Sequence, residues 1–346
     1  MSCDDAPEPG RTAGDQPLDA RTAHPRSALP TAGDGLPTLY RDSSFWGMTV
    51  TQFLGAFNDN LFKQIILLLA LKVAAQDRQW EAMFVFSAPF VIFSGYAGYL
   101  ADRYSKRTII VLAKVAEIVV MLGGLVAFLS FGVSGFPGLL VVLFLMGAQS
   151  AFFGPSKYGI LPEMLRPQDL PRANGVILMT TFLAIIFGAV LAGFLCDLAT
   201  GVTVPPAETE REFASNGDFL ATGVTLSLAE TAHRLWLASA VCVAIAVVGT
   251  LTSLWVRRVP AAAPQLPFRW SALTVPPDSR QMLRADRPLL GAVLASSVFW
   301  LVAGVASPAV NSLGKMQLGL SDTGTSILQA CIGIGIGVGS IVAGRL

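Results

Sequence analysis

The first long apolar stretch of the chain contains three polar side chains whose spacing suits the binding of a charged ligand. Gln52, Asp59 and Lys63 follow one another at intervals of seven and four residues, so they share one face if the stretch is helical. Ionisable side chains in an apolar segment are costly, and they usually face a cavity or a charged partner. Two interpretations are open: Asp59 and Lys63 form a structural ion pair, or they line a cavity for a zwitterionic group or a coupling ion. We favour the cavity, because a buried ion pair gains little stability over apolar packing.

Other polar residues interrupt later apolar stretches. Lys114 and Glu117 are three residues apart, and Lys114 is close enough to the end of its stretch to extend toward the membrane surface. Glu117 is deeper, so it either pairs with Lys114 or faces the cavity. Gln149 adds a polar group to the fourth apolar stretch, shortly before Pro155, which ends or kinks a helix. These residues predict a polar site inside an otherwise apolar bundle.

Eight apolar runs must position these side chains, at residues 45–74, 80–101, 108–131, 137–156, 174–199, 235–256, 288–312 and 323–345. Each run is close to the roughly 20 residues that a helix needs to cross a hydrocarbon core. The chain is 53% hydrophobic and 14% charged, whereas soluble domains are about 25% charged. The sequence therefore predicts an all-α membrane protein with eight spans, and it argues against a soluble helical protein.

A short charged stretch between the second and third runs predicts the orientation in the membrane. The stretch Gly98–Thr108 contains Asp102, Arg103, Lys106 and Arg107. An excess of Lys and Arg marks the cytoplasmic side of a membrane protein. If the N-terminus is cytoplasmic, most of the 24 Lys and Arg residues fall on that side. We therefore expect a multi-pass protein with a cytoplasmic N-terminus.

Composition divides the chain into four segments. Residues 1–42 are rich in Pro, Ala, Gly and Asp, which predicts a disordered cytoplasmic tail. Residues 43–256 hold six spans, residues 257–287 form a basic, proline-rich cytoplasmic loop, and residues 288–346 hold two more spans. Ser340–Arg345 weakly repeats Gly98–Arg103 at the corresponding place, as expected if two six-helix halves arose by parallel duplication. We therefore expect a fragment with eight of twelve spans.

The charged stretch resembles the loop between the second and third helices of the major facilitator superfamily. That loop has the pattern Gly-x-Leu-Ala-Asp-Arg-x-Gly-Arg-Arg, and here Ser105 stands in place of the second glycine. The resemblance implies a twelve-helix transporter fold. It also implies that Asp102 acts as a gate residue toward the eleventh helix, whose N-terminal dipole favours an anion. The whole gating loop would comprise Gly98, Asp102, Arg103, Lys106 and Arg107.

Further motifs are similar to the bacterial lysophospholipid transporter family. They are Phe57–Asn60, Gly154–Glu163, Ala173–Gly175 and Thr181–Gly188. The resemblance implies that lysophospholipids, such as lysophosphatidylethanolamine, move inward across the bacterial cytoplasmic (inner) membrane by alternating access. It also implies reacylation by an acyltransferase, which in some relatives is fused downstream. Carried over by motif, the headgroup contacts would be Asn58, Asp59 and Asn60, while Lys157 and Tyr158 would be gating or structural residues on the inner face.

Three other functions can be compared with the residues. A symporter for a small polar solute remains an alternative, and a hydrophilic cavity closed to lipid would favour it. Acyltransferases of the fused kind use a His-x-x-x-x-Asp motif in which histidine is the base, but no Asp follows His24 or His233 at that spacing. We therefore expect no enzyme activity in this segment. Drug–proton antiporters of the superfamily usually have an arginine in the fourth span, which this chain lacks there.

The composition suggests few other ligands. The four cysteines have no paired spacing and the chain has two histidines, so we expect neither a metal site nor a cofactor. A net charge of +1 with no basic patch argues against nucleic acid. The expected partners are the lysophospholipid and the membrane lipid.

Overall fold

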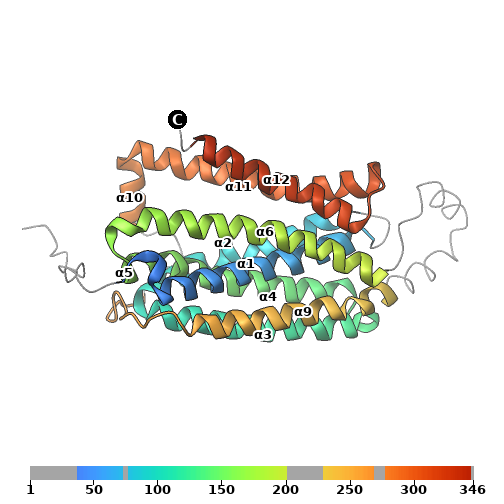
Figure 1. Cartoon of the computed structure of the whole chain (residues 1–346), viewed down its shortest axis with the longest axis horizontal. Coiled ribbons are helices and arrows are strands. Elements are labelled where there is room, and N and C mark those ends of the chain that lie inside the picture. Colours follow the sequence, from blue (N-terminus) through green and yellow to red (C-terminus); the bar gives the residue numbers. More distant parts are fainter. Residues whose placement is uncertain (1–36, 73–76, 201–228, 269–276, 344–346) are drawn as a thin grey trace, which may run out of the picture. The chain divides into compact units, whose positions relative to one another are not determined.

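The structure, a computed structural model, describes residues 37–72, 77–200, 229–268 and 277–343, and the described residues from Thr38 onward form one compact unit. The secondary structure of the described residues is helical (Figure 1). The helices are α1 (Ser43–Ala70), α2 (Gln79–Arg103), α3 (Lys106–Leu129), α4 (Phe131–Gly159), α5 (Leu161–Met164), α6 (Leu170–Thr200), α9 (Trp236–Ser253), α10 (Pro277–Ala285), α11 (Arg287–Ser312) and α12 (Asp322–Ala343). A π-helical segment, Leu313–Gln317, continues α11.

Seven of these helical regions are long and apolar enough to cross a membrane, which confirms the all-α membrane class. They contain α1, α2, α3, α4, α6, α9 and α11. The eighth predicted span corresponds to α12, which is helical but is not among the seven within the described residues. The predicted disordered tail lies largely outside the described residues. Its last part differs from the prediction, because Leu39–Arg41 form a 3-10 turn with Leu39 buried.

The spans run alternately in opposite directions, so the connections gather at two ends. We call the end that carries the α2–α3 connection the near end, and the other the far end. The near end contains the start of α1 and the end of α9. The far end contains the ends of α1 and α6 and the starts of α9 and α12. The predicted central loop, 257–287, begins at the near end and contains the helix α10.

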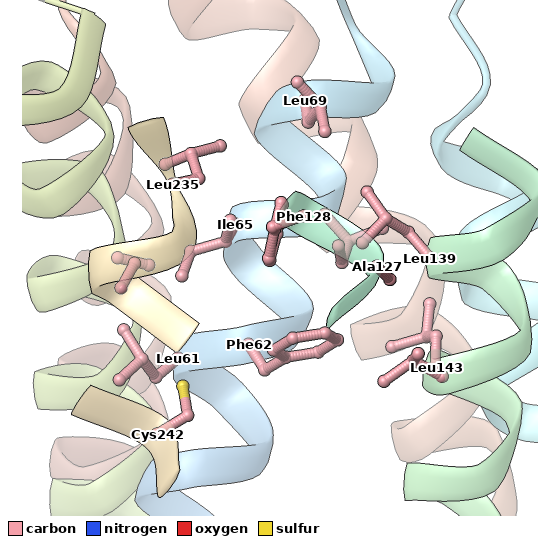
Figure 2. Close-up of a cluster of buried hydrophobic side chains, with 14 of the residues drawn as sticks. Leu61, Phe62, Ile65, Leu69, Ala127, Phe128, Leu139, Leu143, Leu235 and Cys242 are labelled. Atoms are coloured by element: carbon pink, nitrogen blue, oxygen red, sulfur yellow. The ribbon is translucent and has the colours of Figure 1, made fainter. Parts of the chain in front are cut away.

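Helix α1 lies at the centre of the packing. It contacts α6 on one side and α9 on another, while α4 packs on α2 and α3, and α3 packs on α9. Helix α12 packs against α6 and thereby joins the last two helices to the first six. The far half of α1 is buried in an apolar cluster with α3, α4 and α9, in which Phe62 meets Phe128 edge to face at 6.0 Å between ring centroids (Figure 2). Because lipid tails are as apolar as these side chains, close packing rather than the hydrophobic effect holds such helices together.

Candidate functional site

A cavity of about 250 Å³ opens between α1, α2, α3 and α4. It extends from the middle of α1 toward the near end, where α4 finishes. Six residues predicted from the sequence line it, namely Gln52, Asp59, Glu117, Gln149, Lys157 and Tyr158. Phe90, Phe153 and Ser150 also line it and were not predicted, although Ser150 directly follows Gln149. The cavity therefore has charged and amide groups set among aromatic side chains.

Asp59 is held by α4, and it does not pair with Lys63. Its carboxylate accepts hydrogen bonds from Ser150 Oγ at 2.6 Å and Gln149 Nε2 at 3.4 Å. Lys63 instead donates to Asn60 Oδ1 at 2.9 Å and lies 5.2 Å from the centroid of the Phe86 ring. The interpretation of Asp59 and Lys63 as a structural ion pair is therefore wrong. Within the described residues no cation lies in ion-pair contact with Asp59.

Lys157 provides a positive charge in the same cavity. It lies in the last turns of α4, which continues through Pro155 to Gly159, so the prediction that the helix ends at Pro155 is wrong. Its ammonium lies 4.5 Å from the centroid of the Tyr158 ring. Within the described part of the chain it too has no ion-pair partner. The cavity thus contains a carboxylate and an ammonium group that do not neutralise each other by direct contact.

A fully buried ion pair on α3, Lys114–Glu117, lines the cavity. Lys114 and Glu117 are ion-paired, with side chains 2% and 1% exposed, so the prediction that Lys114 extends to the membrane surface is wrong. The reason is space, because Gly55 of α1 faces Lys114 and a Cβ atom there would lie 2.5 Å from Nζ. Glu117 both pairs with Lys114 and lines the cavity. Asn58 donates to Glu117 Oε1 at 2.8 Å, whereas its own Oδ1 is buried without a partner among the described residues.

Three predicted site residues therefore lie outside the cavity lining. Asn58 is fully buried behind Glu117, Asn60 donates to the carbonyl of Ala56 at 2.7 Å, and Lys63 is bound to Asn60. Gln52 does line the cavity and donates a hydrogen bond to Thr181 of α6. Among the polar residues of α1, Gln52 and Asp59 thus face the cavity, whereas the other three are hydrogen-bonded outside its lining.

Comparison with known proteins assigns the family. The family model described as "Major Facilitator Superfamily" matches residues 45–346. The chain belongs to this superfamily. It is 27% identical over 318 residues to the lysophospholipid transporter LplT of Serratia proteamaculans and 26% identical over 320 residues to that of an Enterobacter species. Each match covers 89% of this chain and 69% of the relative. The Escherichia coli LplT is 31% identical over 168 residues, 46% of this chain and 40% of that protein. The resemblance to this family is confirmed.

In this superfamily member the predicted gating loop is fastened to the segment that follows α9. Lys106 pairs with Glu163, and Arg107 donates to the carbonyls of Val256 at 2.6 Å and Leu254 at 3.0 Å. Leu254 caps the C-terminal end of α9 and Val256 follows two residues later, so a cation here also suits the helix dipole.

The other gating-loop residues continue these near-end contacts. Arg103 donates to Tyr99 and to the carbonyl of Leu266 at 3.2 Å. Asp102 is exposed, and its backbone oxygen accepts from the amide of Ala263 at 2.8 Å. Gly98 has open space where a Cβ would be. The loop and the segment after α9 are thus bound to each other through backbone carbonyls.

A second polar assembly, which the sequence did not predict, joins the first six spans to the last two helices at the far end. We call Lys72, Asp197, Lys315 and Asp322 the far-end cluster. The buried carboxylate of Asp322 pairs with Lys72 at 3.0 Å and with Lys315 at 2.5 Å. Asp197, near the end of α6, accepts from the backbone amides of Asp322 at 2.9 Å and Thr323 at 2.8 Å. Since α1 and α6 belong to the first six spans whereas α12 follows the central loop, the cluster holds these two groups of helices together.

Amide side chains extend this contact toward the membrane interior. Gln64 of α1 donates to Asn311 of α11 at 2.9 Å, and Asn311 donates to Gln79 of α2 at 3.0 Å. Ser312 then donates to Asp77 at 2.7 Å. Gln64 and Asn311 are amides inside predicted spans and were the signal in the sequence, but they are more than 200 residues apart. The far end is therefore closed by polar contacts, while the cavity lies toward the near end.

Proposed function

We propose that the chain moves a lysophospholipid with a zwitterionic head group, such as lysophosphatidylethanolamine, inward across the membrane by alternating access. One observation carries the proposal: a single cavity holds a carboxylate, Asp59, and an ammonium group, Lys157, each without a direct ion-pair partner in the described chain. A zwitterionic head group supplies the opposite charge to each. The names of the relatives support the same class of substrate.

Each lining residue takes a defined role in this proposal. Asp59 binds the substrate ammonium and Lys157 binds the phosphate, since charge-assisted hydrogen bonds are the strong ones. Gln149 and Ser150 orient Asp59, to which both already donate. Phe90 and Phe153 contact the first part of the acyl chain. Asn58 then acts by positioning Glu117, and Asn60 is bound to the backbone of α1, so neither contacts the head group.

The arrangement of the two ends supports alternating access. The cavity lies toward the near end, and the far-end cluster closes the opposite side. With the positive-inside rule, the near end faces the cytoplasm, as does the N-terminus. On this proposal the chain is in a state closed to the outside, in the inner membrane of a bacterium, and it acts as a transporter rather than an enzyme. A downstream acyltransferase remains a prediction.

Uptake into proteoliposomes tests the proposal. We expect D59N and K157M to lower uptake of labelled lysophosphatidylethanolamine at least tenfold, because each leaves one charge of the head group unpaired. K63M is the matched control, since Lys63 lies one helical turn away and does not line the cavity. Lysophosphatidylglycerol, which lacks the ammonium, separates the two roles: K157M weakens its binding, whereas D59N does not. Full uptake by a folded D59N variant would refute the proposed site.

A further inference from the structure

A second cavity lies at the far end, away from the site of Asp59. Helices α6 and α9 both pack along α1 but hardly touch each other, so a groove remains between them. Its volume is about 240 Å³. Leu195, Leu198 and Ala199 of α6 form one wall, and Trp236 and Leu237 of α9 form the other. Arg234 lies at its rim, just before α9 begins.

The rim of this groove carries opposite charges. Arg234 pairs with Glu230, one helical turn earlier, at 2.6 Å, and the two side chains are 56% and 67% exposed. Such an exposed pair contributes little to stability, so both groups can exchange partners at low cost. Trp236 is 42% exposed beside them, and its indole N–H is a hydrogen-bond donor. The rim therefore offers a guanidinium, a carboxylate and an N–H donor at the mouth of an apolar groove.

The position of the groove places these groups at the depth of lipid head groups. Leu195 and Leu198 lie in the last turns of α6, a membrane-spanning helix, and Trp236 is the first residue of α9. Tryptophan is enriched at the membrane–water interface because one end of the ring is apolar and the other is polar. A guanidinium group suits phosphate because its N–H donors match the phosphate oxygens in pairs. The apolar walls below it suit hydrocarbon.

We propose that this groove binds a zwitterionic phospholipid, with the phosphate on Arg234 and Trp236, the ammonium on Glu230, and one acyl chain between α6 and α9. The lipid replaces the contact between Arg234 and Glu230 by two contacts of the same kind. Both a lysophospholipid and a diacyl phospholipid carry this chemistry. The proposal does not rest on the transport function, because the groove and the Asp59 cavity have no lining residue in common.

Photo-cross-linking of the full chain in vesicles tests the proposal. The probes are lysophosphatidylethanolamine and diacyl phosphatidylethanolamine, each with a diazirine in the acyl chain, and labelled peptides are identified by mass spectrometry. We expect adducts concentrated at residues 195–199 and 236–238. The relative yield of the two probes tells which lipid occupies the groove, and labelling by either supports the proposal.

Two variants and two controls make the test specific. E230Q/R234Q removes the rim charges and should lower adduct yield at least fivefold, while A199F, which narrows the groove without touching the rim, should lower it by a similar factor. R258Q is the charge control, because Arg258 is exposed beyond the other end of α9. D59N must leave the groove adducts unchanged. The proposal would be overturned if the exposed Val91 and Leu301 were labelled as strongly as the groove residues. It would also be overturned if adduct yield in both groove variants equalled that of the parent protein.

Discussion

Replacing Asp322 by Asn should open the far end of the protein. The Asp322 side chain is 1% exposed and is paired with Lys315, 8% exposed, and with Lys72, 26% exposed. Removing one partner of a buried pair costs about 3–5 kcal/mol, because the other charge stays buried and unpaired. This free energy destabilises the closed state, in which α12 packs against α1 and α6 at the far end. At about 1.4 kcal/mol per tenfold, it is enough to shift the closed-to-open ratio by about 100-fold or more.

The accessibility of a buried cysteine can measure this opening. Ser326 is fully buried on α12, and Gln64 of α1 donates to its Oγ at 3.4 Å. In a background without the native cysteines, S326C should react with a membrane-impermeant maleimide at least tenfold faster when D322N is present. D286N is the matched control, because Asp286 is exposed at the near end, just before α11. Unchanged labelling in a folded D322N protein would refute the reasoning that this carboxylate closes the far end.

Three further predictions concern helix packing. E117Q leaves Lys114 buried without an anion and should lower the free energy of unfolding by about 3–5 kcal/mol, whereas the double variant K114M/E117L should restore most of this free energy. Tryptophan fluorescence during unfolding in detergent measures both variants. A double variant as unstable as E117Q would contradict the argument. In G193A, the new Cβ clashes with the backbone oxygen of Asp322, so thermal stability should fall by the equivalent of about 1–3 kcal/mol, while G175A, with open space, should not lose stability. R107Q removes two hydrogen bonds to the end of α9, so trypsin should cleave after Arg258 faster than in the parent protein.

The sequence predicts the spans well because each is determined locally by length and hydropathy. The sequence also predicts about half of the residues that line the cavity, because polar groups such as Gln149 and Asp59 are conspicuous in apolar runs. It fails where partners come from another helix. Asp59 and Lys63 have the spacing of an ion pair on one helix, yet Asp59 accepts its hydrogen bond from Ser150 of α4. Lys114 could have reached the surface, but Gly55 of α1 gives it room inside.

The far-end contacts show the same limit more strongly. Asp322 stands just before an apolar run, so by itself it is an ordinary residue at the start of a helix. Its partners are Lys72, 250 residues earlier, and Lys315, which a π-helical segment brings to it. No local pattern encodes such a contact, because it depends on how α12 packs against α6 and α1. The resemblance to the transporter family identified the fold without revealing these contacts.

The hydrogen bonds from α12 to Asp197 have a consequence for biosynthesis. Two of the first backbone amides of α12 find their acceptor on α6, 125 and 126 residues earlier in the chain. A helix end with unsatisfied amides is costly in a membrane. When α12 leaves the insertion machinery, its N-terminal turn is therefore incomplete until it meets α6, which is already in the bilayer. The first six helices thus serve as the template on which the second half begins to assemble.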